Sequence, residues 1–241
     1  KISSAPKKGV NRVNWDLKYE STRAVHLKGK KYNPLKKPSS GMLAMPGKYT
    51  VSMKMVVNGV VTELADAVEF TAKPLNNRTL PAENRQGLVD FQNKVAEMSR
   101  VIMGTEKHVN ELVEKLEYMK QAILNSPDIS YDIMKQAKEL EKKLEDILYA
   151  FEGDEAKASW EEVPPQKMPI SNRLYSIIRV HWGSTSAVTQ TQKDSYSILK
   201  EKFTPLYNKV KQISEKDIKE LEEALENAKA PWTPGRIPEW K

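Results

Sequence analysis

A long run of apolar residues, spaced alternately by three and four positions, constrains the fold more than any other feature. The spacing continues for about five heptads and contains one polar residue, Thr105. It is the pattern of a coiled-coil seam, because it returns to the same side of an α-helix every seven residues. A helix over 82–124 would be roughly 65 Å long at 1.5 Å per residue, too long for the interior of a small globule. The seam consists of Leu88, Phe91, Val95, Met98, Ile102, Thr105, Val109, Leu112, Leu116, Met119 and Ile123.

Three further helices are predicted, at about 130–152, 170–182 and 191–228. Pro127 ends the first helix, because proline cannot continue the hydrogen-bond ladder. The short turn that follows favours an antiparallel hairpin. The sequence thus predicts an elongated antiparallel helical bundle over 79–229 with a long coiled-coil-like hairpin. A Pro- and Trp-rich tail, 230–241, cannot be helical and is expected to fold back and pack.

The residues before the helices alternate between apolar and polar, as half-buried strands do. One alternating run ends in Trp15 and Leu17; another begins at Tyr49 and meets an Asn58-Gly59 dipeptide typical of a type I′ hairpin turn. These runs predict an Ig-like or FnIII-like β-sandwich over 9–78, preceded by a linker at 1–8. Trp15 is expected to anchor its core, with Tyr49 packed beside it. The predicted fold class is therefore α+β, in two domains.

Positive charge is concentrated in the β-rich part. Residues 1–78 contain 15 Lys and Arg against 5 Asp and Glu, whereas the remainder contains 24 against 27. A basic surface can bind nucleic acid, anionic lipid or an acidic glycan, but it can equally be a solvated lysine-rich surface. No nucleic-acid motif accompanies the lysines, and we expect no nucleic-acid partner. The candidate interaction residues are Lys28, Lys30, Lys31, Lys36 and Lys37.

The sequence offers no recognisable reaction centre. There is no cysteine, so thiolate metal sites and cysteine nucleophiles are excluded. His26, His108 and His181 lie in three different predicted elements, and the Glu161-Glu162 pair lies in a proline-flanked connector. No Gly-x-Ser-x-Gly elbow, phosphate-binding glycine loop or membrane-length apolar run is present. We therefore expect no catalytic, cofactor-binding or metal-binding residue, and no membrane span.

Two sets of residues carry a family resemblance. Gly-Val-Asn-Arg-Val-Asn-Trp-Asp-Leu at 9–17 and Pro-Gly-Lys-Tyr-Thr-Val at 46–51 resemble the sandwich that follows the β-propellers of bacterial sortilin-like or BNR-repeat proteins, a family associated with glycosyl hydrolases. Asn-Arg-Leu-Tyr-Ser at 172–176, Gly-Ser at 183–184 and Thr-Gln-Thr-Gln at 189–192 are similar to features of the helical region in that family. The propeller repeat itself, Ser-x-Asp-x-Gly-x-x-Trp, is absent.

The resemblance implies a non-catalytic C-terminal structural or interaction module of a larger exported protein, from a bacterium of the Bacteroidetes type. Its expected partners are the upstream β-propeller of the same parent protein and, as a second candidate, an envelope protein. Its expected location is periplasmic, outer-membrane-associated or secreted. Two alternatives stay open: an accessory carbohydrate-binding module, and a coiled-coil subunit that binds a partner in a cell-envelope complex.

Overall fold

The computed structural model describes residues 1–25, 31–36, 39–75, 82–154 and 167–237. The chain forms two compact units. The first consists of 1–21, 32–93 and 181–188, and the second of 22–31, 94–180 and 189–241. Two of the divisions, after residues 93 and 180, fall inside the helices predicted over 82–124 and 170–182.

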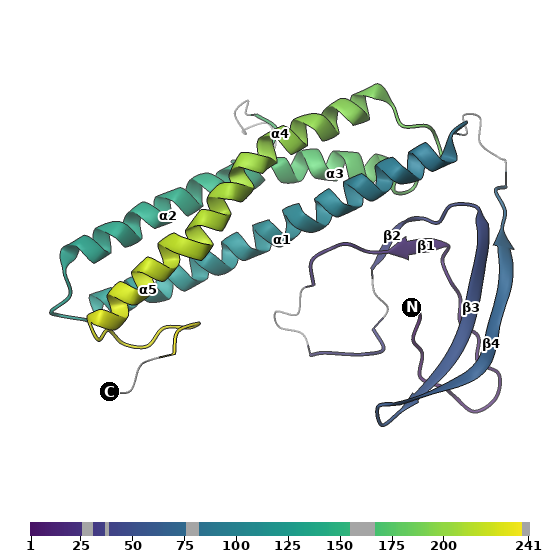
Figure 1. Ribbon diagram of the computed structural model, residues 1–241, viewed down its shortest axis with the longest axis horizontal. Coiled ribbons are helices and arrows are strands. Elements are labelled where there is room, and N and C mark those ends of the chain that lie inside the picture. The colour runs from purple at the N-terminus through teal and green to yellow at the C-terminus, as the bar shows by residue number, and fades with distance from the viewer. Residues whose placement is uncertain (26–30, 37–38, 76–81, 155–166, 238–241) are drawn as a thin grey trace. The chain divides into compact units, whose positions relative to one another are not determined.

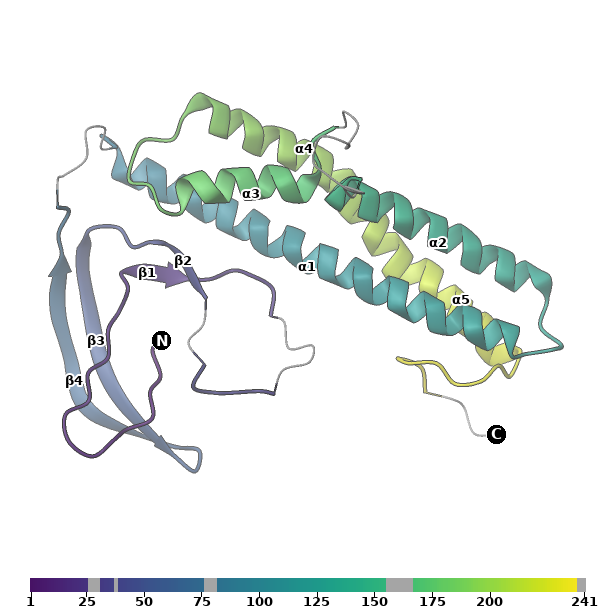
Figure 2. The same cartoon turned by 180° about the vertical axis from the view of Figure 1, so that it is seen from behind.

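The second unit is a bundle with three legs (Figure 1). The first leg is α1, Arg85–Leu124, which enters this unit at Lys94. The second leg runs antiparallel to it and contains α2, Tyr131–Glu152, followed by α3, Ile170–His181. The third leg returns parallel to α1 as α4, Gln190–Gln212, a π turn η2, Ile213–Asp217, and α5, Ile218–Asn227. The view from behind in Figure 2 shows the same arrangement. The expected helices are therefore present, but α2 and α3 share one leg.

The apolar seam of α1 is buried along the bundle. Ile102, Val109 and Met119 have no exposed surface. Across the bundle, the ring of Phe151 on α2 lies 6.3 Å from that of Phe203 on α4. Thr105, the polar position of the seam, donates its hydroxyl proton to the carbonyl oxygen of Val101 at 2.8 Å. The polar group is thus satisfied within its own helix and does not interrupt the packing. Other buried members of the three legs are Ala137, Leu140, Leu144, Ile147, Leu199, Val210, Leu221 and Leu225.

Ion pairs join the legs at their margins. Lys115 of α1 lies 2.6 Å from a carboxylate oxygen of Glu222 on α5, and Lys143 of α2 lies 3.0 Å from one of Asp217 in the π turn. Pairs at bundle margins contribute little free energy by themselves. Their effect is to favour one alignment of the three legs.

The C-terminal tail folds back as the sequence predicts, as far as Ile237. Arg236 and Thr233 are buried. The Arg236 guanidinium donates to the carbonyl oxygens of Ala230 at 3.1 Å and Pro231 at 2.7 Å, and it pairs with Glu226. One arginine therefore closes the tail over the end of α5. Residues 238–241 lie outside the described part.

The β-sandwich prediction is wrong. Within the described residues, the strands form two separate two-stranded antiparallel sheets. One pairs β1, Lys18–Glu20, with β2, Ser40–Leu43; the other pairs β3, Gly47–Val57, with β4, Val60–Ala72. No second sheet packs over either pair in this part of the chain, so the fold is α+β without an Ig-like or FnIII-like sandwich.

The first expected strand is where the prediction fails. Residues 10–16 form no strand, and Val13, two residues before Trp15 in the alternating run, is 53% exposed. Leu17 has a φ of 54°, in the left-handed region that a continuous strand cannot contain. Alternation shows that a segment could be amphipathic, but backbone pairing decides whether a strand forms.

The first unit also recruits residues far along the chain. The Leu43 amide donates to the carbonyl oxygen of Trp182 at 3.2 Å, and the Ala82 amide to that of Thr185 at 3.1 Å. The buried side chain of Gln92 donates to the carbonyl oxygen of His181 at 2.8 Å. These bonds explain why 181–188 belong to the first unit.

We predict that Gly41→Ala weakens the β1–β2 pair. A Cβ at Gly41 would overlap the carbonyl oxygen of Glu20, whereas Gly47 has open space at the same position. Overpacking of this kind costs about 1–3 kcal/mol. Thermal unfolding and amide exchange of residues 18–20 and 40–43 should show the loss, with Gly47→Ala as the control. Equal behaviour of the two variants would contradict the close approach.

Candidate interaction surface

The β3–β4 hairpin is formed as the sequence predicts. Asn58 and Gly59 have φ values of 47° and 81°, the two positive angles of a type I′ turn. The register pairs Val57 with Val60 next to the turn and Tyr49 with Phe70 near the open end. Register shifts between 51 and 54 place the extra residues in β4, so the alternation along β3 continues without a break.

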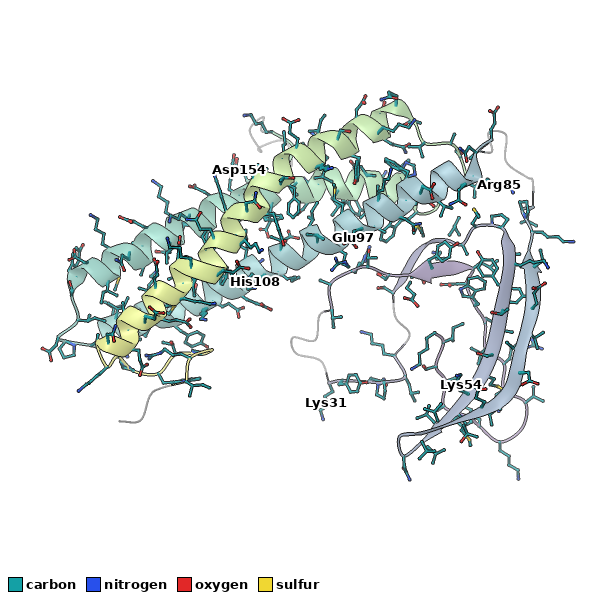
Figure 3. The ribbon with its side chains drawn as sticks, viewed as in Figure 1. Lys31, Lys54, Arg85, Glu97, His108 and Asp154 are labelled. Carbon is teal, nitrogen blue, oxygen red and sulfur yellow. The ribbon has the colours of Figure 1, made fainter. Side chains whose placement is uncertain are left out.

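The two faces of the hairpin differ in character. We call the side that contains Met53 the apolar face. The opposite side has two ion pairs across the strands, Lys48–Glu69 at 2.8 Å and Lys54–Glu63 at 2.7 Å; Lys54 is labelled on β3 in Figure 3. Alternation and register assign ten uncharged residues to the apolar face: Tyr49, Val51, Met53, Met55, Val57, Val60, Thr62, Ala65, Val68 and Phe70.

Most of the apolar face is open to solvent. Val51, Met53 and Val68 are 55%, 56% and 60% exposed. No third strand joins β3 or β4 among the described residues. A two-stranded hairpin is at best marginally stable alone in water, and a contiguous exposed apolar patch commonly marks an interaction site.

An aromatic cluster covers the open end of this face. The ring of Trp15 lies 5.1 Å from that of Tyr49 and 6.0 Å from that of Phe70, both edge to face. Tyr49 and Phe70 stack at 5.9 Å. The indole N–H of Trp15 donates to the carbonyl oxygen of Lys18 at 2.9 Å, which fixes the ring. Trp15 and Tyr49 thus lie side by side, but they close a hairpin and do not fill a sandwich core.

Hydroxyl groups lock the same end. Tyr49 donates to the carbonyl oxygen of Met45, whose amide donates to the Tyr19 hydroxyl at 3.2 Å. The two tyrosine hydroxyls are 3.3 Å apart. Burial, followed by the hydrogen bond and the charge of Tyr19, raises the pKa of Tyr49 to about 12. The neutral phenol is therefore the form that the fold stabilises.

The predicted basic residues are described only in part. Lys31 and Lys36 are exposed and belong to different units. Lys28, Lys30 and Lys37 lie outside the described residues. The predicted basic surface therefore stays a prediction.

A polar group that sequence reasoning missed lies on the bundle. His108 of α1, labelled in Figure 3, has its Nε2 2.7 Å from Ser214 Oγ and its Nδ1 3.5 Å from a carboxylate oxygen of Glu111. Glu111 follows His108 by three positions on the same helix, and this spacing could have predicted their contact from the sequence. Ser214 lies inside the continuous third leg, where backbone N–H groups bond within the helix. No oxyanion-binding pair therefore accompanies the serine, and we assign the group no catalytic role.

No group of three or more His, Asp or Glu side chains suited to a metal ion occurs in the described part of the chain. None of the described helices is both long enough and apolar enough to cross a membrane. No family model, curated protein or solved structure matches the chain.

We predict that Tyr49 titrates near pH 12, later than an ordinary tyrosine. Because the pKa of Tyr49 is higher in the folded than in the unfolded chain, its neutral hydroxyl contributes to the free energy of unfolding. This contribution is fully present below pH 10 and is lost as the pH rises through about 12. Tyr49→Phe should cost about 0.5–1.5 kcal/mol at neutral pH through the lost hydrogen bond. Tyrosinate absorbance and unfolding measured against pH test both statements, with the exposed Tyr118→Phe as the control. An ordinary titration of Tyr49 would contradict the partly buried hydroxyl pair.

Proposed function

We propose that this chain is a non-catalytic structural and interaction module of a larger exported bacterial protein, and that it docks through the apolar face of the β3–β4 hairpin. The observation that carries the proposal is that face: ten uncharged residues in register, largely exposed, on a hairpin held at one end by aromatic rings. The docking partner is a β-sheet of the parent protein's upstream β-propeller.

A sheet is the occupant that the chemistry favours. The apolar face carries no charged residue, and sheets pack face to face at about 10 Å through such surfaces. The outer edges of β3 and β4 also present main-chain donors and acceptors that have no strand partner in the described residues. Propeller blades are small sheets with short protected edges. Residues 9–17 and 46–51 resemble the sandwich that follows the β-propellers of sortilin-like proteins, and this resemblance also favours a propeller sheet as the partner.

The α1 seam is a weaker candidate for docking. Val109, Leu116 and Met119 are buried within the chain's own bundle. A partner helix would have to displace α2 or the third leg to reach them. We therefore assign the bundle a bracing role and the hairpin the docking role.

We predict that Met53→Glu disrupts docking and Ser52→Glu does not. The two residues are neighbours on β3 but lie on opposite faces. A hydrophobic-surface dye should bind the isolated chain and lose much of its fluorescence with Met53→Glu alone. If both variants bind the dye as the unaltered chain does, the apolar face is not an available surface.

We also predict the position of the contact in the native protein. A photo-crosslinking residue in place of Met53 should form crosslinks to a β-sheet outside residues 1–241, whereas the same residue in place of Ser52 should not. Mass spectrometry of the crosslinked peptides identifies the partner. A native protein that contains only this chain, with no crosslink from position 53, would overturn the proposed function.

A further inference from the structure

A cleft in the first unit adjoins the aromatic end of the hairpin through Trp15. It has a volume of about 520 Å³, within the range of small-ligand sites. Its walls come from residues 1–4 and 12–16, from β1, and from residues between Pro34 and Ser40. The side chains that matter most for its chemistry are Arg12, Trp15, Lys18 and Lys36.

The aromatic wall is fixed in advance of binding. Trp15 lines the cleft, while its indole N–H is bonded to the carbonyl oxygen of Lys18 and its ring rests against Tyr49 and Phe70. A ring that is already immobilised loses little side-chain entropy when a ligand packs on it. Aromatic surface combined with a few convergent polar groups suits the C–H and hydroxyl groups of a sugar ring.

Positive charge exceeds negative charge in the same walls. The lining contains four basic residues, Lys1, Arg12, Lys18 and Lys36, and two acidic residues, Asp16 and Glu20. Asp16 already accepts a hydrogen bond from Ser40 at 2.5 Å. Residues 1–78, which contain the cleft, have 15 basic against 5 acidic residues. Arginine in particular forms paired hydrogen bonds with carboxylate groups.

We infer that this cleft binds an anionic oligosaccharide, with a sugar ring packed on Trp15 and a uronic acid carboxylate held by Arg12 and Lys36. The cleft shares Trp15 with the aromatic end of the hairpin, but Met53 and the exposed part of the apolar face do not line it, so the two assignments are tested at different residues. Binding should weaken as the salt concentration rises, because exposed charges are screened, but it should keep a salt-independent part from the aromatic contact.

Isothermal titration of the full chain with a galacturonate oligosaccharide tests the inference, with the neutral galactose oligosaccharide of equal length as the comparison ligand. The galacturonate should bind and the neutral sugar should bind at least about tenfold more weakly. Arg12→Gln with Lys36→Gln should reduce affinity for the galacturonate about tenfold or more. Lys8→Gln with Lys73→Gln removes the same charge from exposed residues outside the cleft and should leave affinity within about twofold.

Trp15→Phe supplies a second readout, because it keeps an aromatic ring against Tyr49 while reducing the surface offered to a sugar. It should weaken galacturonate binding without changing its salt dependence. Absence of binding, equal losses in the two charge variants, or equal affinity for a single-stranded oligonucleotide of the same charge would each overturn the inference. None of these outcomes would affect the Met53 crosslinking result, which tests the docking surface alone.

Discussion

Burial of the α1 seam is the interaction on which the second unit depends. Burial of one Ile, Leu or Phe side chain contributes about 1.5–3 kcal/mol to the free energy of unfolding. Ile102, Leu144 and Leu225 are almost completely buried. No disulfide is possible and no metal-ligand cluster is found in the described residues. Apolar packing between three helical legs therefore has to offset most of the conformational entropy of ordering this unit. The ion pairs at the margins add alignment more than stability.

The first unit is stabilised by local interactions more than by a buried core. Its longest element, the β3–β4 hairpin, is specified locally by an Asn-Gly turn and by cross-strand pairs. Its aromatic end is closed by Trp15, but the rest of its apolar face has no cover among the described residues. A hairpin of this kind gains stability when a second surface is supplied. Exposure of the face is thus a cost to the isolated chain and the basis of the proposed docking.

The sequence was a good guide wherever the structural information is local. Heptad spacing located the buried side of α1, and Asn58-Gly59 located the turn, because both patterns act within a few residues. The sandwich could not be decided in this way, since an alternating run that ends in Trp15 and Leu17 does not say which strand would pair with it. The contact of His108 with Ser214 joins positions 106 residues apart and depends on how the helices pack. The contact between Trp15 and Tyr49 was expected, but it was expected in a sandwich core and it lies at the end of a hairpin.

The π turn between α4 and α5 has a consequence for how the third leg tolerates change. Buried residues there follow the order Val210, Ile213, Ile218 and Leu221, so one interval is five residues long instead of three or four. Each residue of an α-helix turns the chain by about 100°, and the wide turn absorbs the extra rotation. The π turn therefore aligns the buried side of α4 with the buried side of α5. The number of residues between Ile213 and Ile218 is therefore fixed by packing, while the identities of the exposed Glu215 and Lys216 are free to vary.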